Sequence, residues 1–305
     1  MNYADRLATA ILATQSRVCV GLDPRVGSLP APLRQHASAG PQAAADACRE
    51  FCCRIVDEVV GIAPVVKPQA AFFELLGPPG YAALWDVMRH ARDAGLLVIL
   101  DAKRSDIGST AAAYAEGYFA PPGGFTGPDA LTVNPYLGSD GVAPFLQAAA
   151  GADGGIYALV KTSNPSSGEL QDLTVETATG TRLVYQEMGR LVAEWGAELV
   201  GQRGYASLGA VVGATYPEQL AELRAALPTV PFLVPGYGAQ GGGAQDVAPA
   251  FDANGQGAIV NSSRGIIFAY QEEPYRSQFT EDQYAQAAAA AAKQMRDEIN
   301  GALGV

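Results

Sequence analysis

Short apolar segments rich in Val, Ile and Leu recur along the chain, each followed by a polar or glycine-containing turn and then by a longer stretch with helical spacing of apolar residues. This alternation is typical of strand–helix units that build a parallel sheet. The pattern predicts eight strands, at residues 18–23, 64–68, 97–103, 130–134, 157–162, 210–214, 232–235 and 258–261.

Eight strand–helix units within about 250 residues fit a closed (β/α)8 barrel better than an open doubly wound sheet, which usually has fewer strands. We therefore expect residues 1–305 to form a single α/β domain, a TIM barrel. An extra helix is predicted before the first strand, at 3–14, and a final alanine-rich helix at 281–300. The longest irregular segment is expected at 163–180, where it is either a mobile lid above the barrel or an ordinary surface loop.

Residues 101–110, Asp-Ala-Lys-Arg-Ser-Asp-Ile-Gly-Ser-Thr, place two carboxylates and an ammonium directly after the apolar run 96–100. Asp101 and Lys103 share a strand face, roughly 7 Å apart at Cα, so they can enter one pocket. Asp106 lies just beyond, within reach of the same ammonium. Neighbouring carboxylates favour a charged lysine, which is a poor nucleophile, so the pattern favours proton donation or charge stabilisation over Schiff-base chemistry. Taken alone, Asp106 could instead cap a helix and Lys103 could be a solvated ion-pair residue.

Polar residues also end other predicted strands, where barrels of this kind carry their catalytic groups. These residues are Asp23, Lys67, Thr162, Ser163 and Arg264. Because an unpaired buried charge is costly, the carboxylates and lysines at the strand ends should pair across the barrel mouth. Taken singly, Asp23 could be a turn residue and Lys67 a solvated strand end.

A glycine-rich turn, Pro-Gly-Tyr-Gly-Ala-Gln-Gly-Gly-Gly at 235–243, follows the seventh strand. Its backbone N–H groups could bind an anion, and Arg264 adds a bidentate donor where many barrels bind phosphate. A phosphate monoester is therefore the expected substrate. Gly236, Gly238 and Gly241 also fit the dinucleotide fingerprint, but the acidic residue expected about twenty positions later is missing, which makes a nucleotide cofactor the weaker alternative.

The formal net charge of −11 argues against nucleic acid or an anionic membrane as a partner. No apolar run approaches membrane-spanning length, and residues 1–17 lack the apolar core of a signal peptide. The four cysteines form a poor disulfide framework, which favours a reducing, cytoplasmic compartment. Cys48, Cys52 and Cys53 cluster, but neither histidine lies near them, so a zinc site is the weaker alternative. We expect no metal, because Lys67 and Lys103 already supply the positive charge that the strand-end carboxylates require.

Asp101-Ala-Lys103-Arg-Ser-Asp106-Ile107-x-x-Thr110 resembles the signature of the orotidine 5′-phosphate decarboxylase family, particularly its longer bacterial form. Similar strand-end segments occur between about residues 17 and 265, at 21–24, 66–70, 134–136, 161–165, 212–215, 235–242 and 261–264. The resemblance implies a cofactor-independent (β/α)8 homodimer that converts orotidine 5′-phosphate to UMP and CO2, the last step of de novo pyrimidine synthesis.

The resemblance also implies a role for each matching residue. Lys103 would protonate C6 as the carboxylate departs, while Asp101 would lie against that carboxylate and form a charged network with Lys67 and the partner subunit's Asp106. Asp106, Ile107 and Thr110 would act across the dimer. Asp23 and Lys67 would bind ribose hydroxyls, and Ser163 would contact the pyrimidine amide. The phosphate would be held by Pro235, Gly238, Gln240, Gly241 and Arg264.

Two rival functions remain at this point. Barrel enzymes that share an Asp-x-Lys-x-x-Asp motif act on sugar phosphates with Mg²⁺, but they usually carry an acidic residue on the second strand, where this chain has Lys67. A regulatory protein that binds UMP without turnover is the other rival, and the intact Asp101 and Lys103 argue against it.

Overall fold

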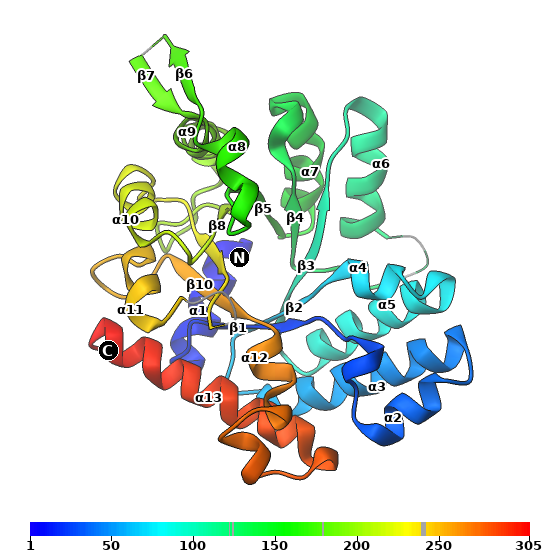
Figure 1. The fold of residues 1–305 in the computed structure, drawn as a ribbon. Coiled ribbons are helices and arrows are strands. Elements are labelled where there is room, and N and C mark those ends of the chain that lie inside the picture. Colours follow the sequence, from blue (N-terminus) through cyan, green and yellow to red (C-terminus); the bar gives the residue numbers. More distant parts are fainter. Residues whose placement is uncertain (122, 124, 179, 239–241) are drawn as a thin grey trace.

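The computed structural model describes residues 1–121, 123, 125–178, 180–238 and 242–305. Parallel strands close into a barrel in the order β1-β10-β9-β8-β5-β4-β3-β2 (Figure 1). These strands are β1 Val18–Leu22, β2 Val65–Pro68, β3 Leu97–Arg104, β4 Ala130–Val133, β5 Gly155–Lys161, β8 Leu208–Val212, β9 Phe232–Pro235 and β10 Ala258–Ser262. The predicted (β/α)8 barrel is confirmed, and each predicted strand overlaps an observed one.

Helices surround the barrel and separate successive strands (Figure 1). They are α1 Tyr3–Thr14, α2 Ala31–Ala37, α3 Pro41–Val59, α4 Ala70–Glu74, α5 Gly77–Asp93, α6 Gly108–Phe119, α7 Ser139–Gly151, α8 Gly168–Gln171, α9 Val184–Gly196, α10 Pro217–Ala226, α11 Ala244–Val247, α12 Arg264–Ile267 and α13 Tyr284–Leu303. The predicted N-terminal helix has the observed bounds of α1, and the predicted final helix corresponds to a 3₁₀ turn, Glu281–Gln283, followed by α13. None of the helices in the described part of the chain is long and apolar enough to cross a membrane.

Two apolar clusters form the core in the part of the chain that the structure describes. The larger one lies between the strands and the outer helices, where Phe51 of α3 stacks on Phe268 and Tyr284. The smaller one fills the barrel interior and includes Cys19, Val65, Ile99, Ala130, Tyr157, Val211, Leu233 and Ile259. Because both faces of each strand meet apolar neighbours, the strands read as continuous apolar runs, which explains why the pattern located them.

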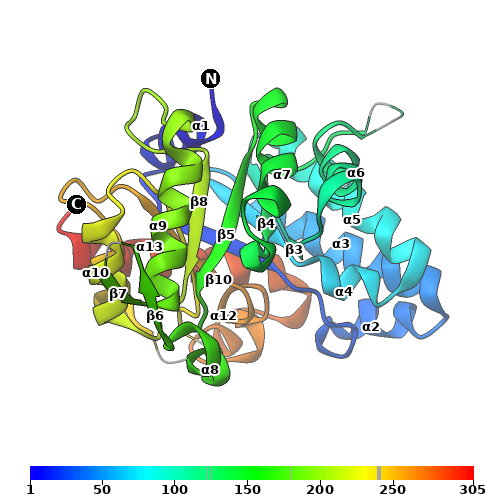
Figure 2. The same ribbon diagram turned by 90° about the horizontal axis from the view of Figure 1, so that it is seen from above.

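Helix α1 covers one end of the barrel. Its buried face presents Tyr3, Leu7 and Ile11, spaced four residues apart, to the interior cluster. The hydroxyl groups of Tyr3 and Tyr157 lie 3.1 Å apart, and both side chains are buried. Figure 2 shows α1 and α8 at opposite ends of the barrel, so the segment after β5 lies at the open end, where the strands terminate.

The expectation of an irregular segment at 163–180 is wrong in its second half. A 3₁₀ turn, Pro165–Ser167, leads into α8, and an antiparallel hairpin follows, formed by β6 Thr174–Thr177 and β7 Gly180–Leu183. The hairpin projects beyond α9, away from the barrel (Figure 1). Its strands are mostly polar, and their residues are exposed or half-buried, so they lack the apolar runs that located the barrel strands.

Candidate active site

The C-terminal end of β3 departs from regular strand geometry. The pairing register with β4 shifts between Leu100 and Arg104, and Lys103 has a left-handed backbone with φ of 46°. The Thr132 hydroxyl, on β4, accepts hydrogen bonds from the backbone N–H groups of Ala102 at 3.0 Å and Lys103 at 2.9 Å. Asp101 and Lys103 therefore meet through a bulged strand end and not through a regular one.

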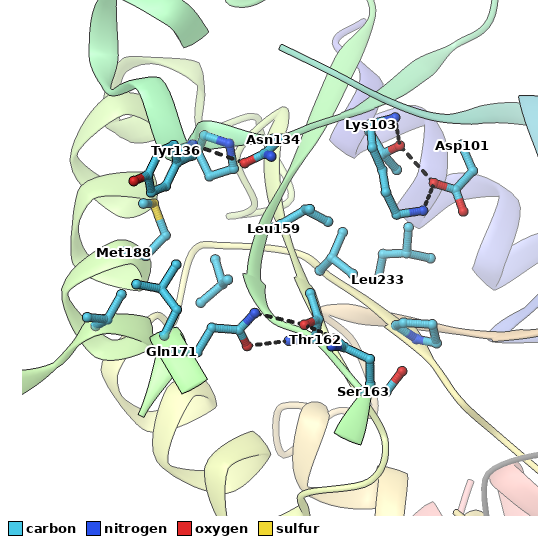
Figure 3. A pocket seen from close by; sticks show the side chains of 18 of the residues that line it. Asp101, Lys103, Asn134, Tyr136, Leu159, Thr162, Ser163, Gln171, Met188 and Leu233 are labelled. Atoms are coloured by element: carbon cyan, nitrogen blue, oxygen red, sulfur yellow. Dashed lines mark hydrogen bonds and ion pairs between the residues drawn. The ribbon is translucent and has the colours of Figure 1, made fainter. Parts of the chain in front are cut away.

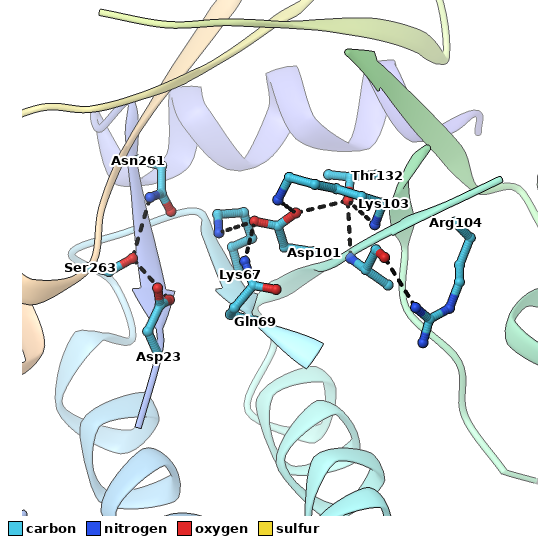
Figure 4. A network of polar contacts seen from close by, with 10 residues as sticks. Asp23, Lys67, Gln69, Asp101, Lys103, Arg104, Thr132, Asn261 and Ser263 are labelled. Carbon is cyan, nitrogen blue, oxygen red and sulfur yellow. Dashed lines mark hydrogen bonds and ion pairs between the residues drawn. The ribbon is translucent and has the colours of Figure 1, made fainter. Parts of the chain in front are cut away.

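The Asp101 carboxylate lies at the centre of a polar network (Figure 4). Its Oδ1 accepts hydrogen bonds from Lys103 Nζ at 2.7 Å and Thr132 Oγ1 at 2.9 Å. Its Oδ2 accepts hydrogen bonds from Lys67 Nζ and Gln69 Nε2, both at 2.9 Å. All four lone-pair directions of the carboxylate are therefore engaged.

This network keeps the central pair charged. Burial would raise the pKa of Asp101, but the ammonium groups of Lys67 and Lys103 outweigh it and hold that pKa well below its usual range. Burial would lower the pKa of Lys67, but the carboxylates of Asp101 and Asp23 outweigh it and raise that pKa. The site thus holds an ionised carboxylate between two ammonium groups, of which Lys67 is buried and Lys103 is 47% exposed.

Asp23 belongs to a second set of contacts, at the ends of β1 and β10. Its Oδ1 accepts a hydrogen bond from Ser263 Oγ at 2.9 Å, and the Asn261 amide donates to the same hydroxyl at 3.4 Å. A Cβ at Gly21 would lie 1.9 Å from Ser263 Oγ, so only glycine permits this approach of the strands. Asp23 forms no ion pair within the described residues, but its carboxylate helps to raise the pKa of Lys67, so the expected pairing of charges across the barrel mouth acts here without a direct salt bridge.

Two adjoining cavities open over this network, and both are lined by Lys67, Asp101 and Pro235. The larger, about 560 Å³, also includes Lys103, Ser163 and an apolar wall that contains Leu159, Met188 and Leu233 (Figure 3). The smaller, about 290 Å³, also includes Asp23, Gly236, Asn261 and Arg264. An elongated ligand could thus span from Ser163, across the charged network, to Arg264.

Four of the expected site residues that the structure describes lie outside both cavities: Asp106, Ile107, Thr110 and Gly238. Asp106 accepts a hydrogen bond from the backbone N–H of Ile107 and forms no ion pair with Lys103 in the described structure of one chain, so its expected place in the network of a partner subunit stays a prediction. Ile107 is 54% exposed, and Thr110 is exposed in the first turn of α6. Gly238 is exposed with φ of 72°, whereas Gln240 and Gly241 lie outside the described residues.

The sequence interpretation gave no role to two residues that bond Asp101, nor to a buried lysine on β5 that lines neither cavity. Thr132 and Gln69 both bond Asp101. Lys161, at the end of β5, is fully buried, bonds Asp172 at 2.6 Å and faces the rings of Tyr185 and Tyr216. A charge in the apolar run 155–161 was the available signal for Lys161, whereas Thr132 and Gln69 are neutral and carried none.

Within the described residues, no three His, Cys, Asp or Glu side chains are grouped so that they could hold a metal ion. Cys48, Cys52 and Cys53 are free thiols, so the weaker zinc alternative gains no support. The dinucleotide alternative is also disfavoured, because the glycine-rich turn belongs to a closed barrel and not to an open sheet.

Comparisons with known proteins agree with this geometry. The family model described as "Orotidine 5′-phosphate decarboxylase / HUMPS family" matches residues 16–276. An orotidine 5′-phosphate decarboxylase from Rhodopirellula baltica is 51% identical, covering 99% of this chain and 100% of the relative. One from Deinococcus radiodurans is 44% identical, covering 100% and 99% respectively. The structure of the Leishmania donovani OMP decarboxylase has a TM-score of 0.74 at 35% identity, with complete coverage of both chains.

Proposed function

Because this chain belongs to the orotidine 5′-phosphate decarboxylase / HUMPS family, we propose that the Asp101 network is the catalytic centre of an orotidine 5′-phosphate decarboxylase. The chain is a carboxy-lyase that converts orotidine 5′-phosphate to UMP and CO2 in pyrimidine biosynthesis. The observation that carries the assignment of residues is one ionised carboxylate held between two lysine ammonium groups at the floor of a cavity.

The reaction needs charge stabilisation and one proton. The bond between C6 and the carboxylate breaks, its electron pair stays on C6, and CO2 leaves. Lys103 Nζ then donates a proton to C6, which yields UMP, and the neutral amine regains a proton from water. Lys103 and Lys67 stabilise the negative charge that develops at C6, and Asp101 fixes both ammonium groups before the substrate binds.

The two cavities suit the remaining parts of the nucleotide. Ser163 would contact the pyrimidine amide in the larger cavity, and Asp23 and Lys67 would bind ribose hydroxyls between the cavities. Arg264 would bind the phosphate together with Pro235, Gly238, Gln240 and Gly241. Arg264 is exposed and forms no ion pair in the part of the chain that the structure describes, so its guanidinium is available to an anion. Remote phosphate binding could then contribute to transition-state stabilisation.

We also propose a homodimer in which Asp106, Ile107 and Thr110 act across the interface. Support comes from an exposed apolar patch near the ends of β3 and β4, made by Ile107 at 54%, Tyr114 at 41%, Tyr136 at 73% and Leu137 at 45% exposure. Apolar patches of this kind mark interaction sites. A partner that covers the patch would bring the Asp106 carboxylate of one chain to the other chain's network.

We also propose that the protein is cytoplasmic and that residues 1–305 form a single domain. All four cysteines are free thiols, and burial raises the pKa of Cys48 and of Cys53 to about 11, so these thiols would persist in a reducing compartment. The sugar-phosphate alternative with Mg²⁺ is disfavoured because Lys67 occupies the position next to Asp101 that a cation would need.

The loss of ultraviolet absorbance of orotidine 5′-phosphate, measured in EDTA, tests this function. We expect turnover by the wild-type protein and none by Lys103→Ala. Lys293→Ala is the matched control, because Lys293 is exposed on α13 and far from the site in sequence. A wild-type protein without turnover in EDTA would contradict the metal-free activity, and turnover by Lys103→Ala would contradict the assignment of the proton donor.

A further inference from the structure

We propose that Thr132 is a positioning residue for the decarboxylation, because one hydroxyl group fixes both the backbone of Lys103 and the carboxylate of Asp101. The inference rests on the proposed function in one respect, since it takes Lys103 as the proton donor. Thr132 lies on β4 and is 1% exposed, and its neighbours in the strand are apolar.

The direction of every hydrogen bond at this hydroxyl is determined by its partners (Figure 4). The backbone N–H groups of Ala102, at 3.0 Å, and Lys103, at 2.9 Å, can only donate, so they occupy the two lone pairs of Oγ1. The single hydroxyl proton therefore goes to Asp101 Oδ1, 2.9 Å away. Thr132 is fully engaged: two of its three bonds go to Lys103 and Asp101, and the third goes to Ala102, which lies between them in the chain.

The bonds to the backbone stabilise an uncommon conformation. Lys103 has φ of 46°, which lies in the left-handed region that residues other than glycine rarely adopt. The register of β3 shifts here, and the N–H groups of Ala102 and Lys103 both bond the Thr132 side chain of β4. Removal of the hydroxyl at position 132 takes this shared acceptor away, so we expect Lys103 to relax from the left-handed region.

The bond to Asp101 fixes the rotation of the carboxylate. Oδ1 is held by Thr132 and faces Lys103, and Oδ2 faces Lys67 and Gln69. Proton transfer to C6 requires Lys103 Nζ at a defined position, and a small displacement of a reacting group is costly to the rate. The phosphate and ribose contacts lie on other strands, so loss of the hydroxyl should lower kcat and leave KM nearly unchanged.

A series at position 132 tests the inference. Thr132→Val keeps the shape and removes the hydroxyl, Thr132→Ser keeps the hydroxyl, and Thr132→Cys offers a thiol that is only a weak donor and acceptor. We expect kcat of Thr132→Val to fall about 100-fold with KM within about threefold, and Thr132→Ser to retain most of the activity. Thr132→Cys should fall between them. Thr9→Val, which removes an exposed hydroxyl of α1, is the control and should change neither constant.

Crystal structures of the wild type and of Thr132→Val give a measurement that is independent of activity. We expect Lys103 of the variant to leave the left-handed region and its Nζ to separate from Asp101 Oδ1. An unchanged Lys103 together with wild-type kcat would overturn the inference, as would equal losses in Thr132→Ser and Thr132→Val. If Thr132→Val does not fold, a Thr132→Cys enzyme with wild-type kcat overturns it. Wild-type protein without turnover would instead refute the proposed function, and the two crystal structures would still decide whether Thr132 positions Lys103.

Discussion

At the end of β3, one carboxylate accepts hydrogen bonds from four side chains, and two of these donors are charged. Asp101→Asn keeps the size of this side chain but removes its charge and with it the ion-pair partner of Lys67, which is 3% exposed. We expect kcat to fall by about 10²-fold or more, because the ammonium groups lose their preorganised positions, and KM to change much less. Steady-state kinetics on orotidine 5′-phosphate measure both constants, and an unchanged kcat would refute an electrostatic role for Asp101.

The residues of this network differ in how far the sequence could predict them. Lys67, Asp101 and Lys103 interrupt apolar runs, and the high cost of an unpaired buried charge made their convergence predictable. Thr132 is a neutral residue in a buried strand, and it acquires its contacts only through the bulge between Leu100 and Arg104. That bulge depends on how β3 pairs with β4, which is tertiary information that the local pattern does not carry.

The segment between β5 and α9 is attached to the barrel by contacts close to the cavity. Lys161 bonds Asp172 at 2.6 Å, and the Gln171 side chain bonds both the backbone N–H and the hydroxyl of Thr162. Leu170 and Gln171 also line the larger cavity, so this attachment sets the position of one cavity wall. The buried ammonium of Lys161 has rings of Tyr185 and Tyr216 beside it, and Asp172 is its anionic partner in the described structure.

We expect Asp172→Asn to loosen this segment. The loss of charge should cost roughly 1 kcal/mol of ordering free energy, because Asp172 is 44% exposed, and should raise KM for orotidine 5′-phosphate about fivefold with little change in kcat. Faster tryptic cleavage after Arg182, in the β6–β7 hairpin, would report the same loosening. Glu169→Gln is the control, because Glu169 is exposed in α8 of the same segment. Equal KM values and equal cleavage rates for both variants would show that the ion pair does not hold the segment.

Helices and strands could be predicted where their buried faces require a regular pattern of apolar residues in the sequence. The barrel strands are enclosed on both faces, so each is a continuous apolar run, and α1 has apolar residues every fourth position on the face that covers the barrel. The β6–β7 hairpin meets solvent on much of its surface, so its residues follow no apolar period, and the antiparallel pairing of Thr174 with Leu183 could not be predicted.

At the scale of the whole molecule, Asp106 is notable because its carboxylate forms no ion pair with the charged network in the described structure of its own chain. Its carboxylate lies between the Lys103 turn and α6, has no ion pair in the described structure, and adjoins Ile107 of the exposed apolar patch. In a two-fold symmetric dimer the same patch would meet itself, so each chain would contribute Asp106 to the partner's network and receive the partner's Asp106 in return.

Subunit complementation distinguishes this arrangement from one in which Asp106 acts within its own chain. We expect Lys103→Ala and Asp106→Ala proteins each to be nearly inactive alone. In a hybrid dimer, one site receives both substitutions and the other receives neither. Random reassociation of equal amounts makes half of the dimers hybrids, so about one quarter of wild-type activity should return after the two proteins are dissociated and mixed. Wild-type protein taken through the same treatment sets the reference. Dimers by sedimentation without recovered activity would place Asp106 in the site of its own chain, and a monomer would refute the homodimer itself.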